Sequence, residues 1–299
     1  MSIFSVSELF ISIEGEFSGS TALSKGFAGT PTVYVRLTGC NKTCAGFNNP
    51  ENLDTRDALS FDPSRIAVVQ DIPEIIYGCD SIYSWHPDFA HMWKSYTTDE
   101  LIDQLELLLP NGKWTHPLSN MNYILSLTGG EPLMHQKQLS SLLIHPRMKE
   151  CKHILFETNG SVPLIPAFKE VLINWCKEDA TRLVTFSISP KLSASGETWK
   201  LSIRPKVINT MVLPVSNVNM YFKFVCDANE EHFEEVYKAM EEYWNNGISK
   251  DYGVGIMPVA CTEEQQRTIA RSVALMCIKY GFSYSHRIQN TIFNNEIGT

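Results

Sequence analysis

The sequence lacks the long apolar run of a membrane-spanning helix, because no stretch reaches about 18 consecutive apolar residues. It lacks any block of Lys and Arg, and its 25 basic against 33 acidic residues give a net charge of −8. A protein that mainly grips duplex nucleic acid is therefore not expected. The opening MSIFSVSELFISIEGE has no basic leader, which argues against a secretory signal. We expect a cytoplasmic protein that binds neither membrane nor nucleic acid directly.

A third closely spaced cysteine is also missing. The segment LTGCNKTC places Cys40 and Cys44 after a short apolar stretch, with three residues between them. One more cysteine three positions on would complete the loop of an iron–sulfur radical enzyme, but that position is Phe47. The next cysteine is Cys79 in YGCDSIYSW, and 34 residues separate it from Cys44.

The cysteines by themselves leave the kind of site open. In a reducing compartment eight cysteines favour metal binding or catalysis over a disulfide framework. Either an iron–sulfur cluster or a structural Cys3His zinc site, completed by His86 or His91, is compatible with the spacing. A chain without metal is the third possibility. The cysteines outside these motifs lie in strand or helix patterns and are expected in the core: Cys151, Cys176, Cys226, Cys261 and Cys277.

Short β-rich runs alternate with longer amphipathic patterns. The expected strands share consecutive apolar and β-branched residues and span 32–38, 123–129, 153–158, 183–189, 220–226 and 253–258. The expected helices span 97–109, 165–178, 229–246 and 262–281, two of them opened by capping boxes. This alternation predicts an α/β fold with a parallel sheet, in one domain a full or partial β/α barrel.

Two regions depart from the alternation. Residues 17–31 form a Gly/Ser-rich loop, and residues 45–96 show no regular pattern and contain four prolines. A loop of this length in a compact domain is usually functional or an insertion. We predict one domain over 1–299, with an insertion at 45–78.

Polar motifs follow three of the expected strands: LTGGEPLMH, FETNGS and SISPKLS. Each could be an ordinary turn when taken alone. In a β/α barrel, however, the carboxyl ends of the strands carry the chemistry. Two adjacent glycines would also let a ligand approach the backbone closely.

Together these motifs resemble the 7-carboxy-7-deazaguanine synthases of the radical S-adenosylmethionine superfamily. GCNKTC and CDSIYSW are similar to the two parts of that family's Cys-x3-Cys-x2-Cys loop, here separated by the insertion. ELFISIEGEFSG is similar to the family's N-terminal segment, with Glu14 where glutamine is common and Phe17 where glycine is common. The resemblance implies a partial (β/α)6-type barrel and covers nearly the whole chain outside the insertion.

The resemblance also implies a set of site residues. Cys40, Cys44 and Cys79 would bind three irons of a [4Fe–4S] cluster and leave the fourth for S-adenosylmethionine. Ser81, where the family has threonine, would ligate Mg²⁺. The implied cosubstrate-pocket residues are Gly129, Gly130, Glu131, Pro132, Glu157, Thr158, Asn159, Ser189 and Lys191. The implied substrate-binding residues are Glu14, Glu16, Arg36 and, with a surface histidine as the alternative, His286.

The implied reaction is the ring contraction of 6-carboxy-5,6,7,8-tetrahydropterin to 7-carboxy-7-deazaguanine with loss of ammonia. The same resemblance implies that an external one-electron reductant, such as flavodoxin or ferredoxin, serves the protein. It also implies a homodimer. One rival is a radical S-adenosylmethionine activase that places a glycyl radical on a partner enzyme, although SIEGE and SPK would be superfluous there. The other is a zinc-stabilised binding protein without activity.

Overall fold

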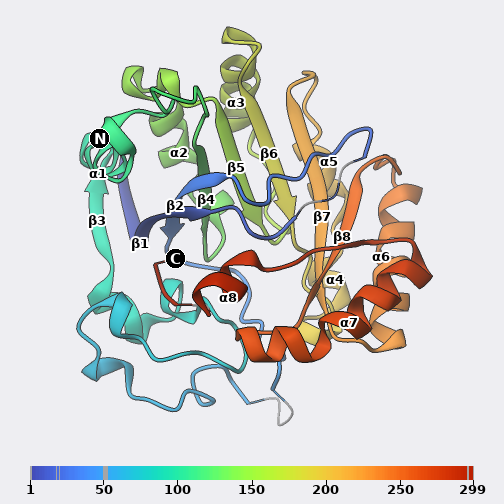
Figure 1. The fold of residues 1–299 in the computed structure, drawn as a ribbon. Helices are drawn as coiled ribbons and strands as arrows, with labels where there is room; N and C mark the ends of the chain where they lie inside the picture. The colour runs from blue at the N-terminus through green and yellow to red at the C-terminus, as the bar shows by residue number, and fades with distance from the viewer. Residues whose placement is uncertain (1, 18, 20, 50–52, 295, 299) are drawn as a thin grey trace.

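A nine-stranded mixed sheet organises the chain (Figure 1). The computed structural model describes residues 2–17, 19, 21–49, 53–294 and 296–298, so 50–52 of the expected insertion lie outside it. The strands are β1 (Ile3–Ile13), β2 (Pro31–Leu37), β3 (Lys94–Thr97), β4 (Ile124–Gly129), β5 (His153–Thr158), β6 (Leu183–Ile188), β7 (Val218–Cys226), β8 (Gly253–Pro258) and β9 (Ser283–Tyr284). Their order across the sheet is β3-β1-β2-β4-β5-β6-β7-β8-β9.

The predicted α/β class is confirmed, and each of the six expected strands is present. Across the sheet, each neighbouring pair in the series β2-β4-β5-β6-β7-β8-β9 is parallel. Sequence reasoning missed β1, β3 and β9. β1 pairs antiparallel with both β2 and β3, so one margin of the sheet is antiparallel.

The helices lie between these strands in the chain. They are α1 (Thr98–Leu108), α2 (Gln136–Leu143), α3 (Pro166–Glu178), α4 (Trp199–Ser202), α5 (Pro205–Met211), α6 (Glu230–Asn245), α7 (Glu263–Tyr280) and α8 (Ile288–Phe293). Both predicted capping boxes are formed, by Thr97 with Glu100 and by Thr262 with Gln265. Each satisfies free amides of a first helical turn. Within the described segments, no helix is both long and apolar enough to cross a membrane.

The main core lies between the sheet and the helices. Phe156 of β5 stacks on Phe186 of β6 with ring centroids 5.4 Å apart, and Phe222 of β7 stacks on Tyr243 of α6 at 4.9 Å. All four rings are buried. Because β2 and β4–β8 are parallel, their carboxyl ends open on one edge of the sheet.

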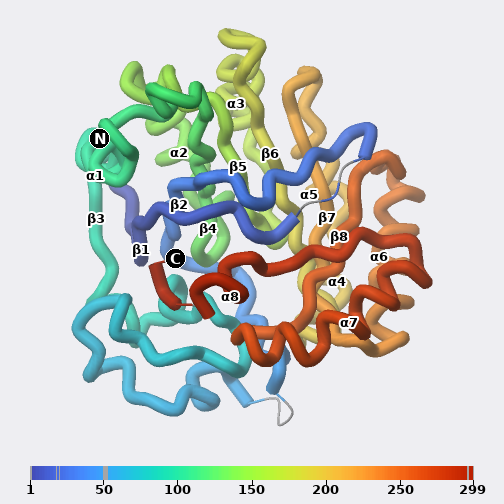
Figure 2. Tube along the Cα trace, viewed as in Figure 1, coloured from blue at the N-terminus to red at the C-terminus, as the bar shows by residue number. Residues whose placement is uncertain are grey.

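The region after β2 forms a second, smaller hydrophobic cluster. It contains residues of the expected insertion and residues that follow Cys79, namely Val69, Ile72, Ile75, Ile82, Tyr83, Phe89 and Met92. The partly buried Ile297 near the C-terminus packs against it. Figure 2 shows this part of the chain folded below the sheet in that view. Part of the segment predicted to be an insertion is therefore packed against residues that follow the third cysteine.

We expect Phe89→Ala to destabilise the protein by about 3–5 kcal/mol, because it empties the centre of the second cluster. Phe89 has no exposed surface, whereas Leu118 is 90% exposed and makes a matched control. Leu118→Ala should change stability by less than about 0.5 kcal/mol. Urea unfolding of both variants checks this, and equal midpoints would show that the second cluster adds no stability.

Candidate functional site

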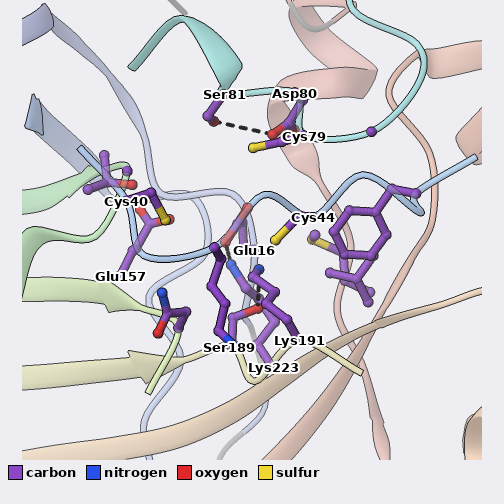
Figure 3. Close-up of a pocket in the computed structure, with 18 of the residues that line it drawn as sticks. Glu16, Cys40, Cys44, Cys79, Asp80, Ser81, Glu157, Ser189, Lys191 and Lys223 are labelled. Carbon is purple, nitrogen blue, oxygen red and sulfur yellow. Dashed lines mark hydrogen bonds and ion pairs between the residues drawn. The ribbon is translucent and has the colours of Figure 1, made fainter. Parts of the chain in front are cut away.

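A cavity of about 190 Å³ opens at the carboxyl edge of the parallel sheet (Figure 3). Its walls come from the loops that follow β2, β4, β5 and β6, from the end of β8 and from β7 itself. All three predicted cluster cysteines line it. So do several residues predicted to hold the cosubstrate, namely Gly129, Gly130, Glu157, Thr158, Asn159, Ser189 and Lys191. The structure thus brings together residues from distant parts of the chain.

The loop of the first two cysteines is held by a carboxylate that sequence reasoning missed. Glu197 Oε1 accepts hydrogen bonds from the amides of Thr43 and Cys44, at 2.9 and 3.2 Å. Lys42 Nζ lies 3.2 Å from Glu197 Oε2 and neutralises the carboxylate. Cys44 has a positive φ of 50°, which is uncommon for a residue with a side chain. The Glu197 contacts hold it in this conformation.

The third cysteine reaches the cavity because the chain returns to Phe47 after the insertion. The amide of Gly78 donates a hydrogen bond of 2.7 Å to the carbonyl oxygen of Phe47. The amide of Cys79 donates to Thr55 Oγ1 at 3.4 Å, and Thr55 is fully buried. Gly78 has a φ of +71°, and an added Cβ there would lie 2.3 Å from Thr55 Oγ1. Cys79 is therefore anchored beside the position where a closely spaced third cysteine would stand.

The three thiols lie in an environment that favours their neutral form. Burial raises the pKa of each, that of Cys40 to about 12. A metal that binds them would have to displace the protons, as thiolate ligation requires. The indole Nε1 of Trp85 donates to Cys79 Sγ at 3.4 Å. Such hydrogen bonds to sulfur tune the potential of iron–sulfur centres.

The arrangement differs from a closed zinc site. Within the described part of the chain, no three His, Cys, Asp or Glu side chains converge on a position for a single metal ion. A zinc site needs all its sulfur ligands about 2.3 Å from one ion, whereas the cysteines of a four-iron cluster bind different irons. The two histidines considered for zinc, His86 and His91, are absent from the described cavity wall. His91 Nε2 instead lies 2.8 Å from the carbonyl oxygen of Ile66.

The Gly-Gly-Glu-Pro turn after β4 is required for close packing of two backbones. A Cβ on Gly129 would lie 2.3 Å from the carbonyl oxygen of Leu37, and one on Gly130 would lie 1.9 Å from that of Gly39. Gly129 also has a φ of +108°. The two glycines let this turn press against the cysteine loop, where the sequence had suggested close approach of a ligand.

Glu131 and Pro132 lie behind the described cavity wall. The Glu131 carboxylate is fully buried and accepts hydrogen bonds from Thr158 Oγ1 and from the Asn159 amide, both at 2.8 Å. It therefore ties the turn after β4 to the loop after β5. Pro132 starts a short 3-10 helix, Pro132–His135.

A second chamber of about 280 Å³ adjoins the first. The two share a set of charged and polar residues, namely Glu16, Arg36, Asp80, Ser81, Glu157 and Arg287. Arg36 Nη1 donates to Ser81 Oγ at 3.3 Å, and Ser81 Oγ donates to Asp80 Oδ1 at 3.2 Å. Two guanidinium groups and a hydroxyl thus meet at the junction, a combination suited to a carboxylate ligand.

Arg36 is fixed by partners on its inner side. Its Nε lies 3.0 Å from Glu8 Oε2, and its guanidinium carbon lies within 6 Å of the ring centroids of Phe10 and Tyr83, at 5.5 and 5.9 Å. The ion pair and the rings hold the guanidinium in one orientation. Sequence reasoning predicted Arg36 but missed its partner Glu8.

Glu16 lies in the cavity and pairs with a lysine that sequence reasoning missed. Lys223 of β7 forms an ion pair with Glu16 Oε2, and both line the first chamber (Figure 3). Burial lowers the pKa of Lys223 to about 8, an effect that the nearby Glu14 opposes. The available signal was a lone lysine within the apolar run MYFKFVC, since lysine is almost never buried without a partner.

Glu14 lies outside both described cavity walls, although it was predicted to bind substrate. Its carboxyl accepts from the Glu16 amide at 3.2 Å and from Tyr34 Oη at 3.3 Å. Burial and the neighbouring Glu157 raise its pKa to about 8. The raised pKa favours the uncharged acid at neutral pH.

Near the C-terminus, the sequence analysis proposed His286 as a substrate-binding residue. The residue that lines the cavity is its neighbour Arg287. His286 Nε2 lies 2.7 Å from Thr291 Oγ1, away from the described lining residues, while Arg287 lines both chambers and pairs with Asp80 at 3.3 Å. Cys261 is buried as expected but lies on the wall of the first chamber. The other four cysteines expected in the core are part of the main hydrophobic cluster.

The fold and the cavity define an α/β protein with three cysteines and several buried charges at the carboxyl edge of a parallel sheet. No family model matches the chain. Curated relatives named 7-carboxy-7-deazaguanine synthase match nearly all of it. The Rhodopirellula baltica protein is 26% identical, over 98% of this chain and 88% of its own. The Halobacterium salinarum protein is 23% identical over 97% and 90%, and the Hyperthermus butylicus protein 24% identical over 96% and 91%.

The chain is therefore similar, along nearly its whole length, to enzymes named 7-carboxy-7-deazaguanine synthase. This confirms the resemblance that the motifs indicated.

We expect stability to fall as pH rises from about 4.5 to about 8, in part because folding must then return a proton to Glu14 that the unfolded chain has released. Its folded-state pKa is raised, so over this interval the folded protein holds a proton that the unfolded chain has released. Glu14→Gln should flatten this decline. Urea unfolding at several pH values checks it, with the exposed Glu150→Gln as the control. An unchanged profile in Glu14→Gln would show that Glu14 is already ionised at neutral pH.

Proposed function

We propose that the protein is a 7-carboxy-7-deazaguanine synthase of the radical S-adenosylmethionine superfamily. The observation that carries the proposal is the meeting of Cys40, Cys44 and Cys79 in one cavity with the ends of parallel strands. Similarity to synthases over nearly the whole chain supports it. On this proposal the sheet is the partial β/α barrel of that superfamily, in a single domain interrupted by 45–78.

The residues present fit a [4Fe–4S] cluster with one open iron. Three cysteines line one cavity, and a hydrogen-bond donor, Trp85 Nε1, contacts the sulfur of Cys79. A site of three cysteines leaves a position for an external ligand, which a four-cysteine site would not. The polar residues after β5 and β6 line the same cavity, so S-adenosylmethionine would lie against Thr158, Asn159, Ser189 and Lys191.

The protein's own groups would position the substrate. Arg36 and Arg287 at the junction would hold the carboxylate of 6-carboxytetrahydropterin, and Ser81 would offer a hydroxyl to Mg²⁺. Glu16 would meet the guanidine-like edge of the pterin once it leaves Lys223. The chemistry supplied by the bound cofactors is reductive cleavage of S-adenosylmethionine and hydrogen-atom transfer at the substrate. The cavity walls would orient the reactants and exclude water.

Partners follow from the same proposal. Cleavage of S-adenosylmethionine needs one electron from an external reductant, such as flavodoxin or ferredoxin. The homodimer is proposed by similarity to the family.

The function is tested by anaerobic turnover of cluster-reconstituted protein with reductant, S-adenosylmethionine, Mg²⁺ and 6-carboxytetrahydropterin. We expect mass spectrometry to detect 7-carboxy-7-deazaguanine. If only 5′-deoxyadenosine accumulates, the substrate assignment is wrong and a glycyl-radical activase becomes the better hypothesis. Formation of neither compound, with zinc in the purified protein, would favour the non-catalytic binding protein.

We predict that Cys79→Ala loses the cluster as fully as Cys40→Ala, because both are ligands on this proposal. Iron and sulfide contents of the anaerobically reconstituted variants provide the measurement. Cys151→Ala, which changes a buried cysteine of the main core, is the control and should keep normal iron. A normal cluster in Cys79→Ala would refute the hypothesis that Cys79 is the third cluster ligand.

The contact between Gly78 and Phe47 suggests a sharper test of the same point. In the double variant Phe47→Cys/Cys79→Ala, the third thiol moves from position 79 to position 47, whose backbone contacts Gly78 beside it. We expect it to regain part of the iron that Cys79→Ala loses, because Phe47 lines the same cavity. Phe47→Ala/Cys79→Ala is the matched control without a thiol. Equal iron in the two double variants would contradict the expectation.

A further inference from the structure

The insertion supplies one wall of the second chamber. Its lining residues there are Gln70, Ile72, Pro73, Glu74 and Ile75. This part of the chain lies outside the motifs that resemble the family. The aromatic side chains of Phe10 and Tyr34, from β1 and β2, line the same chamber. The predicted insertion therefore lines the same chamber as Arg36 and Arg287 at the junction.

The wall is a packed segment. Val69, Ile72 and Ile75 are buried in the second hydrophobic cluster, and a short 3-10 helix spans Val69–Asp71. The amide of Ile72 donates to the carbonyl oxygen of Val69 at 3.1 Å. The apolar side chains thus hold the segment in place, while Gln70 and Glu74 are exposed and line the chamber.

Charge is distributed unevenly along the chamber. Arg36 and Arg287 lie at the junction with the first chamber, where they pair with Glu8 and Asp80. The insertion wall carries Glu74 and the neutral amide of Gln70. Partial burial raises the pKa of the Glu74 carboxyl. This wall therefore offers hydrogen-bond acceptors to a ligand.

The remaining walls suit a flat ligand. Phe10 and Tyr34 stack on each other at 4.8 Å with an interplanar angle of 8°, and they form a rigid aromatic part of the chamber wall. Aromatic side chains pack well against planar rings. The volume of about 280 Å³ is close to the lower end of small-ligand pockets, roughly 300 Å³.

We propose that Gln70 and Glu74 of the insertion determine substrate specificity together with Glu16, by accepting hydrogen bonds from the N–H edge of a planar heterocycle whose carboxylate lies at Arg36 and Arg287. The inference rests on the proposed function, since the ring contraction acts on a heterocycle of this class. It adds that the insertion takes part in recognition. The Gln70 amide contributes an oxygen acceptor, and the Glu74 carboxylate contributes a charged one.

The test is a fluorescence titration of the full-length, cluster-free protein with pterin-6-carboxylate. Glu74→Gln should weaken binding roughly tenfold, as expected for loss of one charged hydrogen bond at a partly exposed site. Gln70→Ala should weaken it less, because its acceptor is neutral. Asp71→Asn is the matched control, since Asp71 is an exposed acid in the same segment outside the described chamber wall. It should bind like the wild type.

A second probe separates recognition from a merely structural effect. Lumazine-6-carboxylate carries an oxygen in place of the pterin amino group and so has fewer N–H donors. The wild type should prefer the pterin, and Glu74→Gln should reduce this preference, which a general loss of packing would not do. The inference is wrong if Glu74→Gln and Asp71→Asn bind both probes equally well. It is also wrong if the wild type binds neither probe.

Failure of this inference can be distinguished from failure of the proposed function. Turnover by the wild type together with unchanged pterin binding in Glu74→Gln would keep the function and reject the role of the insertion. Pterin binding that depends on Glu74, without formation of 7-carboxy-7-deazaguanine, would keep the recognition site and reject the reaction.

Discussion

The candidate site depends on one backbone hydrogen bond, from the Gly78 amide to the Phe47 carbonyl oxygen. It closes the excursion that begins after Cys44 and brings the following residues to the cavity. Cys79, Asp80 and Ser81 all line the wall immediately after this contact. Closing a loop costs only about 0.6 kcal/mol more for each doubling of its length. An insertion can therefore grow at this point without moving the cysteines apart, provided that its two ends meet.

The insertion supports this contact with its own packing. Thr55 accepts from the Cys79 amide, and the second hydrophobic cluster joins insertion residues to Ile82 and Phe89, which follow the cysteine. A segment that merely looped out would leave Cys79 on a flexible tether. The structure instead gives it a buried frame on both sides.

Buried charge is balanced around the two chambers by pairs from different elements. Arg36 of β2 meets Glu8 of β1, Lys223 of β7 meets Glu16, and Arg287 meets Asp80. Glu8 and Lys223 are buried, so removing the partner of either would leave a buried charge without compensation, which is strongly unfavourable. Glu14 avoids this cost differently, since burial keeps it protonated at neutral pH. The site thus combines several ionisable groups with a stable core.

Much of the fold and part of the site could be predicted from the sequence. Buried parallel strands appear as apolar runs, so six of them were identified directly, whereas Thr158 and Ser189 at their ends were assigned to the pocket by resemblance. β1 was missed because its Ser and Glu residues break the apolar run, and β9 because it has only two residues. Lys223 and Glu197 were missed because each acts on a residue more than 150 positions away.

The sequence by itself determined the α/β class and the strand ends, because these depend on local periodicity and residue type. The choice of three cysteines among eight came from the resemblance of their motifs to a known family. Only the tertiary structure decided that Phe47 meets Gly78, that Arg287 and not His286 reaches the cavity, and that the insertion faces a second chamber. Those results depend on contacts between distant segments. Such contacts arise from packing of the whole chain and leave no periodic signal in the sequence.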